Sequence, residues 1–290
     1  MPESNYRPEN ISRIFLLPNL MTAGNLIFGF LAVLKIFEGS IQKETGGAVA
    51  DWTHTYTISL YCILAACLFD LLDGRLARLG GRESPFGREF DSLADIVSFG
   101  VAPALLVFKI VLFNLPSRIG WIIAVFYLLC GAFRLARFNV AATYNLGTGT
   151  RNFTGFPVPA AAGLISSITL LIISQYQKEA DLPFGYGGIG LASLMIFLSF
   201  MMVSKFEYPS FKGFNWRTQF SPPKFLGVVL VLGLTIVYIE WMPAVIFVAY
   251  LLYGFLRPFL SRAWRKEIEE EEEDGLIVEP VAPPPPPEDL

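Results

Sequence analysis

The chain alternates long apolar runs with short polar segments. A hydrocarbon core about 30 Å thick is crossed by a helix of roughly 20 apolar residues, so this pattern predicts about eight membrane-spanning helices. We expect an all-α fold, a polytopic membrane helix bundle with a six-helix core and two further helices near the C-terminus. The predicted spans are residues 19–37, 55–72, 92–113, 119–137, 157–174, 186–203, 224–241 and 243–258.

Composition agrees with a membrane protein. Hydrophobic residues make up 53% of the chain and charged residues 16%, whereas a soluble domain carries about 25% charged residues. The polar start, MPESNYRPENISRIF, lacks the basic segment of a signal peptide, so the first span is expected to be retained. The single histidine, His54, argues against a histidine-based triad or zinc site. The expected surroundings are the lipid bilayer, and no nucleic-acid partner is expected.

Basic residues predict the orientation. If the N-terminus is cytoplasmic, the external loops hold only Lys43, Arg118 and Lys178, and most other Lys and Arg lie on the cytoplasmic side. This distribution follows the positive-inside rule and predicts cytoplasmic N- and C-termini. We divide the chain into an N-terminal segment, a membrane core, a C-terminal transmembrane hairpin and an acidic, Pro-rich tail expected to be disordered. Their ranges are 1–17, 18–205, 206–266 and 267–290.

Four aspartates stand where the second span ends and the third begins, in DLLDGRLARLGGRESPFGREFDSLAD. Asp70 and Asp73 are three residues apart, and Asp91 and Asp95 are four apart, so each pair shares one helix face. Carboxylates at membrane depth are costly unless paired or functional. Two divalent cations would balance the four charges, and oxygen ligands favour Mg²⁺ or Mn²⁺. Such a pair of ions can assist phosphoryl transfer.

The stretch reads Asp70-x2-Asp73-Gly74-x2-Ala77-Arg78-x8-Gly87-x3-Asp91-x3-Asp95, which resembles the signature of the CDP-alcohol phosphatidyltransferase family. The resemblance implies attack of an alcohol on a CDP-linked lipid, with release of CMP, in an enzyme that is a homodimer. Asp70, Asp73 and Asp91 would ligate two metal ions, and Asp95 would complete that site and act as general base. The CDP-lipid site would be lined by Gly74, Ala77, Arg78, Gly87 and, near the phosphates, Ser84.

Three further stretches narrow the choice of the alcohol that accepts the phosphatidyl group. PNLMTAGNLIFGFLAV, CGAFRLARFNV and GFPVPAAAG resemble the phosphatidylserine synthases of this family. The implied substrates are CDP-diacylglycerol and L-serine, and the implied location is a bacterial-type cytoplasmic membrane with the active site facing the cytoplasm.

Several polar residues in these stretches have two interpretations each. Arg134 and Arg137 could grip the serine carboxylate or anchor the topology. Asn139 could bind serine or cap a helix, and Asn19 and Thr22 could reach the CDP-lipid or cap the first helix. Asn25, deeper in the span, is expected to form an interhelical hydrogen bond.

Three other functions compete with serine transfer. The same chemistry could use glycerol 3-phosphate or an inositol phosphate, and Arg151 adds to the cations available for such an acceptor. The aspartates could instead belong to a divalent-cation transporter, although transporters place such sites near the midplane and often contain inverted repeats. A membrane scaffold recruited through the tail is the third alternative.

Overall fold

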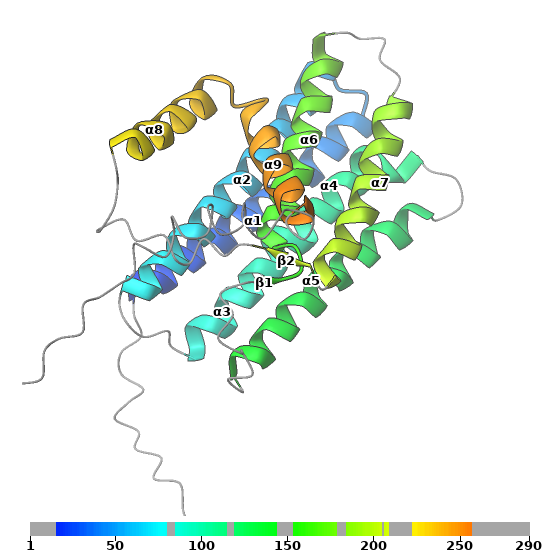
Figure 1. Cartoon of the computed structure of the whole chain (residues 1–290). Coiled ribbons are helices and arrows are strands. Elements are labelled where there is room, and N and C mark those ends of the chain that lie inside the picture. The colour runs from blue at the N-terminus through cyan, green and yellow to red at the C-terminus, as the bar shows by residue number, and fades with distance from the viewer. Residues whose placement is uncertain are drawn as a thin grey trace, which may run out of the picture.

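Helices account for nearly all of the structure, a computed structural model that describes residues 16–79, 85–114, 119–143, 153–178, 184–204, 206–208 and 222–256 (Figure 1). The helices are α1 (Leu16–Glu44), α2 (Val49–Leu79), α3 (Pro85–Asp95), α4 (Ala102–Ile110), α5 (Ile119–Thr143), α6 (Val158–Lys178), α7 (Phe184–Val203), α8 (Pro222–Val237) and α9 (Met242–Leu256). A π-helix, η2 (Ile96–Val101), joins α3 to α4, and a 3-10 turn, η3 (Leu112–Asn114), follows α4. Two short strands, β1 (Phe153–Thr154) and β2 (Glu207–Tyr208), pair antiparallel.

Each predicted span overlaps one of these helices, and the all-α membrane bundle is confirmed. Within the described residues, five helical segments are long and apolar enough to cross a membrane. Four of them are α1, α2, α5 and α6. The other is a continuous rod made of α3, η2 and α4. Helices α7 and α9 contribute shorter apolar stretches. The protein is therefore an integral membrane protein.

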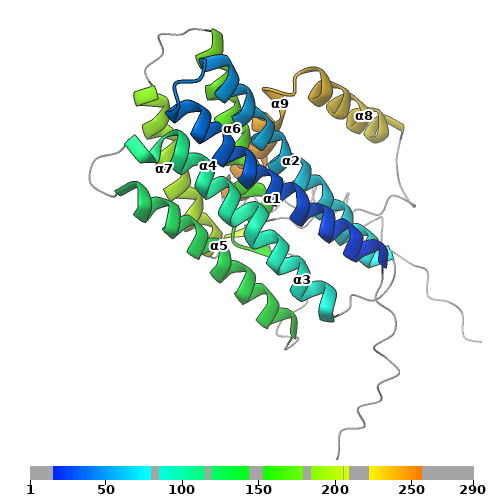
Figure 2. The same ribbon diagram turned by 180° about the vertical axis from the view of Figure 1, so that it is seen from behind.

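The rod and α6 are the most buried of the spanning segments, and α1, α2, α5, α7 and α9 pack around them. Helices α1 and α2 form a long antiparallel pair joined by a turn in which Gly46 has a φ of 78°, a conformation that side chains disfavour. From behind, α1 lies along the rod, with α5 on the rod's other side (Figure 2). The large apolar side chains exposed on α1 and α5, such as Ile27 and Trp121, suit contact with lipid.

Helix α1 meets the rod closely at the π-helix. A Cβ on Gly29 would lie 2.0 Å from Ser98 Oγ and 2.7 Å from its Cα. Ser98 Oγ donates a hydrogen bond to the Asn25 carbonyl at 3.0 Å, and Tyr127 of α5 donates to the Phe99 carbonyl at 3.1 Å. A π-helical turn disturbs the regular ladder of backbone hydrogen bonds, so these side chains fix a part of the rod that its own backbone holds less regularly.

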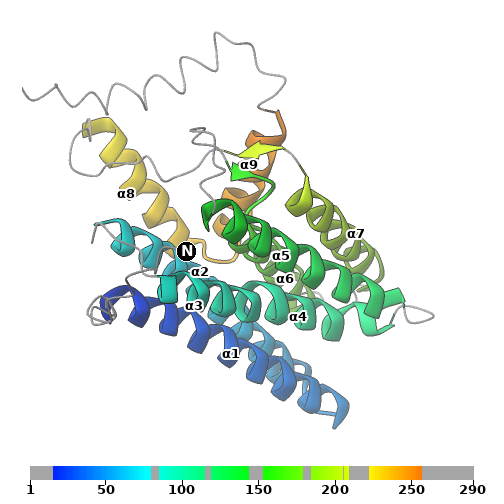
Figure 3. The same ribbon diagram turned by 90° about the horizontal axis from the view of Figure 1, so that it is seen from below.

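The two C-terminal helices are placed differently from each other. Helix α9 packs against α6, whereas α8 stands away from the bundle and meets α9 only near their shared turn (Figures 1 and 3). The connection between them is short, as the sequence predicts, but the two helices diverge and do not pack along their lengths. The rest of the predicted hairpin segment, residues 209–221 and 257–266, and the predicted tail, 267–290, lie outside the described residues.

We expect Gly29→Ala to destabilise the protein. The added methyl group would displace the backbone of Ser98, and overpacking of this kind costs about 1–3 kcal/mol, more than the gain in helix propensity from Gly to Ala. Thermal unfolding in detergent measures the effect. Gly190→Ala in α7, where no atom of the described segments lies within 4 Å of the new Cβ, is the matched control. Equal melting temperatures for the two variants would contradict the close contact.

Candidate active site

Three of the four signature aspartates come together between α2 and α3. Asp70 lies on α2, and Asp91 and Asp95 lie on α3. One carboxylate oxygen from each of these three residues falls within 4.8 Å of the others. Asp95 is only 6% exposed, and Asp70 and Asp91 are half-buried. The helix faces predicted from residue spacing therefore do face each other across the two helices.

The fourth aspartate, Asp73, is held from α1. Its side chain is 6% exposed, and Thr22 Oγ1 donates a hydrogen bond to its Oδ2. Thr22 also lies 3.2 Å from the Pro18 carbonyl, one turn earlier in α1. Asp73 thus lies beside the three-carboxylate cluster, but its side chain is held by a hydrogen bond from α1.

Asn25 gives α1 a second contact with the site. This side chain is fully buried, and its Nδ2 donates to Asp95 Oδ1 at 3.0 Å. The expectation of an interhelical hydrogen bond is confirmed, but the partner was not predicted. A signal exists in the sequence, because Thr22, Asn25 and Gly29 recur on one face of α1 at helical spacing. That face is the one that meets α2 and the rod.

The cluster fits a divalent cation. Three carboxylates held this close in a poorly solvated site repel one another when ionised, and a bound dication would remove the repulsion. Every atom of the cluster that could act as ligand is a carboxylate oxygen, the type preferred by Mg²⁺ and Mn²⁺. Asp70, Asp91 and Asp95 are the residues that could share one ion, and Asp73 is near enough to interact electrostatically with Asp70 and Asp95.

The capping interpretations of three polar residues are wrong. Helix α1 begins at Leu16, so Asn19 and Thr22 lie inside its first turns and cannot be N-caps. Asn139 lies inside α5, which continues to Thr143. Its Nδ2 donates to Ser92 Oγ on α3 at 2.9 Å, so it ties α5 to the helix that carries Asp91 and Asp95.

Arg134 and Arg137 are both on α5 but have different surroundings. Arg134 is 8% exposed, and its Nη2 lies 3.5 Å from the Gly155 carbonyl. Its Nε is buried and has no hydrogen-bond partner among the described residues. Arg137 is exposed and lies 3.4 Å from the Val203 carbonyl. The two side chains therefore do not form one clamp, and only Arg134 points into the bundle.

Two of the predicted CDP-lipid residues, Asn19 and Thr22, lie on α1, and the others lie close to the aspartates in sequence. A Cβ on Gly74 would meet no atom within 4 Å, so packing within the described protein does not require glycine there. Gly87 lies on α3, one turn before Asp91. Ala77 and Arg78 belong to α2, but their side chains, like all of Ser84, lie outside the described residues.

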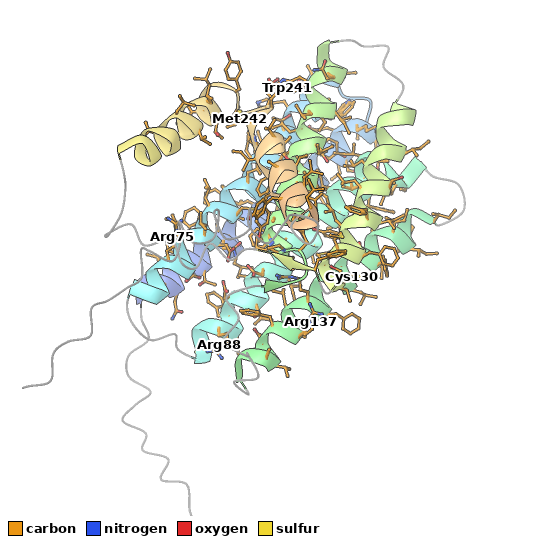
Figure 4. The ribbon with its side chains drawn as sticks, viewed as in Figure 1. Arg75, Arg88, Cys130, Arg137, Trp241 and Met242 are labelled. Atoms are coloured by element: carbon orange, nitrogen blue, oxygen red, sulfur yellow. The ribbon has the colours of Figure 1, made fainter. Side chains whose placement is uncertain are left out.

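Arginines gather at the aspartate end of the bundle. Arg75, Arg88 and Arg137 lie toward one end, and Trp241 and Met242 lie at the other (Figure 4). Lys109 and Glu44 form a 3.6 Å ion pair far from the aspartates, near the turn between α1 and α2. The aspartates thus lie toward an end of the membrane bundle where these arginines gather.

The fold and site define a membrane helix bundle with an acidic cluster between two of its helices, and comparison of sequences identifies the family. The profile of the CDP-alcohol phosphatidyltransferase family matches residues 15–203. The chain belongs to this family, as the aspartate signature predicts. The match includes α1 to α7 and ends before α8 and α9.

Similar proteins include several named for serine chemistry. The chain is 32% identical, over 85% of its length and 92% of the other, to a CDP-diacylglycerol–serine O-phosphatidyltransferase of Helicobacter pylori. It is 34% identical to an enzyme of that name from Bacillus subtilis, over 68% of this chain and 91% of the other. An archaetidylserine synthase of Methanothermobacter thermautotrophicus is 34% identical, over 72% of this chain and 76% of the other.

We expect Asn25→Ala to weaken Mn²⁺ binding about tenfold. Loss of the hydrogen bond frees Asp95 to rotate, and removal of such supporting contacts typically lowers metal affinity 10–100-fold. Titration of Mn²⁺ into the purified protein, followed by electron paramagnetic resonance, measures the free ion directly. Thr57→Ala, in the far half of α2 and hydrogen-bonded only to its own helix, serves as control. Unchanged affinity in Asn25→Ala would show that Asp95 is oriented without Asn25.

Proposed function

We propose that the protein transfers the phosphatidyl group of CDP-diacylglycerol to the hydroxyl of L-serine, giving phosphatidylserine and CMP. The single observation that carries this proposal is the cluster of carboxylates that the family's signature residues Asp70, Asp91 and Asp95 form. The names of the relatives support serine as the acceptor. A divalent-cation transporter is not favoured, because the chain belongs to a transferase family.

The signature residues would hold the CDP group at the end of the bundle. Asp70, Asp73, Asp91 and Asp95 would bind two divalent cations, Mg²⁺ or Mn²⁺. When bound, such ions neutralise charge on the pyrophosphate and on the departing CMP. The open space over Gly74 would admit the nucleotide close to the α2 backbone. The acyl chains would remain in the bilayer, against the apolar faces of the helices.

Asp95 would act as general base. The hydroxyl of serine is a weak nucleophile, and a carboxylate within hydrogen-bond reach can take its proton as the new P–O bond forms. The oxygen of the phosphoanhydride then leaves with CMP, so no covalent enzyme intermediate is needed. Asn25 would aim this carboxylate, since its amide already donates to Asp95 Oδ1.

Arg134 would bind the serine carboxylate. Among the described residues, Arg134 is the only buried Lys or Arg, and no described carboxylate forms a salt bridge with it. A guanidinium is well suited to a carboxylate. A phosphorylated acceptor carries more negative charge and would be better served by several buried cations. One buried arginine therefore favours an amino acid over glycerol 3-phosphate or an inositol phosphate.

The remaining parts of the proposal concern the setting of the enzyme. We place it in a bacterial-type cytoplasmic membrane with the active site and both termini on the cytoplasmic side, where soluble serine is available. The arginine-rich end would then be the cytoplasmic end, in keeping with the positive-inside rule. A homodimer stays a prediction from the family resemblance.

An acceptor screen tests the function. The purified protein receives CDP-diacylglycerol with serine, inositol 1-phosphate or glycerol 3-phosphate in the presence of Mg²⁺ or Mn²⁺, and CMP release is measured. We expect CMP and a serine-labelled lipid with serine alone. Release only with a phosphorylated acceptor would overturn the serine assignment, and no release with any acceptor would overturn the transferase.

We expect Asp95→Asn to abolish turnover while CDP-diacylglycerol still binds within a fewfold of the wild type. The amide is nearly the same size but cannot accept the serine proton. The rate of CMP release and the binding of a labelled CDP-lipid are measured on the same preparation. Near-normal turnover would remove Asp95 as the base.

Gly74→Val is expected to raise the KM for CDP-diacylglycerol at least tenfold without lowering the melting temperature by more than a few degrees. At its Cβ the added side chain meets no atom of the described residues within 4 Å, so it should obstruct the ligand without disturbing the fold. Gly227→Val in α8, also surrounded by open space, controls for the change in helix propensity. Wild-type KM in Gly74→Val would exclude Gly74 from the CDP site.

A further inference from the structure

Helix α9 lies beyond residues 15–203, which match the family, yet it is built into the bundle. A Cβ on Gly163 of α6 would fall 2.2 Å from the ring of Phe247, so the aromatic ring occupies the space that glycine leaves. Ala244 and Leu251 on the same helix are 3% and 8% exposed. Helix α9 is therefore a packed wall of the core, unlike α8.

This wall reaches the surroundings of Arg134. The ring of Tyr250 stacks at a tilt on that of Phe156, with centroids 5.7 Å apart. Phe156 is fully buried, and its backbone N–H donates to the Met201 carbonyl at 3.0 Å. The preceding residue, Gly155, provides the carbonyl near Arg134 Nη2. Tyr250 thus borders the short segment that contacts the buried arginine, and it lies within electrostatic range of that arginine.

The backbone at this point has little freedom to adjust. Gly155 has a φ of 84°, and a Cβ there would lie 2.3 Å from the Met202 carbonyl oxygen. Its N–H donates to the Phe206 carbonyl at 2.8 Å, beside the β1–β2 pairing. The Gly155 carbonyl, which lies near Arg134, is therefore held by α7 and by the segment that leads into β2, while α9 adds an aromatic hydroxyl nearby.

Arg134 is poised for an anionic ligand. A buried cation without a salt-bridge partner is unfavourable, and within the described part of the chain the buried Nε of Arg134 has no hydrogen-bond partner. A ligand carboxylate would supply both the charge and the hydrogen-bond acceptor. Asp95 also lies within electrostatic range of Arg134, so a small acceptor held at the arginine would be near the carboxylate cluster.

We propose that Tyr250 of α9 is a specificity-determining residue of the acceptor subsite centred on Arg134. This inference rests on the proposed function, because it takes Arg134 to be the acceptor's carboxylate partner. A phenol hydroxyl donates to a carboxylate and accepts from an ammonium group without adding net charge. One arginine and one tyrosine suit a zwitterionic amino acid, whereas a doubly charged phosphate would leave its extra charge without a partner.

The decisive variant is Tyr250→Phe in the full-length protein, because it keeps the ring on Phe156 and removes only the hydroxyl. Steady-state CMP release is measured with serine varied at saturating CDP-diacylglycerol, and then with CDP-diacylglycerol varied at saturating serine. We expect the KM for serine to rise roughly tenfold, the effect of losing one hydrogen bond to a charged group. The KM for CDP-diacylglycerol and the melting temperature should stay within error. Tyr238→Phe, at an exposed tyrosine in the turn before α9, should behave as wild type.

Two outcomes overturn the proposal: a serine KM within twofold of wild type, or a parallel rise in both KM values with a lower melting temperature. The second would mean that Tyr250 supports only the fold. Serine binding to Asp95→Asn and to Asp95→Asn/Tyr250→Phe, measured by equilibrium dialysis with CDP-diacylglycerol present, gives a readout without turnover, and weaker binding is expected in the double variant.

Failure of the proposed function gives a different result. If wild-type protein uses a phosphorylated acceptor and not serine, the serine assignment fails already in the acceptor screen, before any variant is made. An unchanged KM for that acceptor in Tyr250→Phe would then also overturn the role of Tyr250. If wild-type protein does use serine, only the response of the serine KM to Tyr250→Phe decides.

Discussion

Mutual repulsion among buried carboxylates is the constraint on which the rest of this structure depends. Asp70, Asp91 and Asp95 converge within 4.8 Å at a helix interface, where ionised groups are poorly solvated and repel strongly. The fold holds them together by attaching them to long, rigid helices that are fixed elsewhere by packing. Free energy gained along the apolar lengths of α2 and the rod offsets the repulsion at their ends, and cations of the type proposed would relieve it.

Helix α1 is the element that orients two of the aspartates. It lies close enough to the rod for Gly29 to touch the π-helix, and from that position its Thr22 and Asn25 side chains reach Asp73 and Asp95. The π-helix begins directly after Asp95, and such turns often occur at functional sites. The close approach of two backbones and the orientation of a carboxylate are thus two consequences of the same contact.

The proposed acceptor side is built from more distant parts of the chain. Arg134 comes from α5, the Gly155 carbonyl from the segment before α6, and Tyr250 from α9, which the family profile does not include. Segments outside a shared core are free to vary without loss of the common chemistry. A helix added to such a core is therefore a natural place for residues that select the acceptor, while the residues proposed to bind the metal ions and the nucleotide lie within the core.

The sequence by itself determined the membrane bundle, the family and the pairing of the aspartates on two helices, because hydrophobic run length and i, i+3 or i, i+4 spacing are local properties of the chain. It also marked Asn25 as an interhelical residue. Only the tertiary structure decided that Asp73 accepts a hydrogen bond from Thr22, that Arg134 is buried while Arg137 is exposed, and that Asn139 joins α5 to α3. Only the tertiary structure showed that α9 packs into the bundle whereas α8 stands away from it. These outcomes depend on which helix faces meet, and residue spacing along a single helix carries no information about its neighbour.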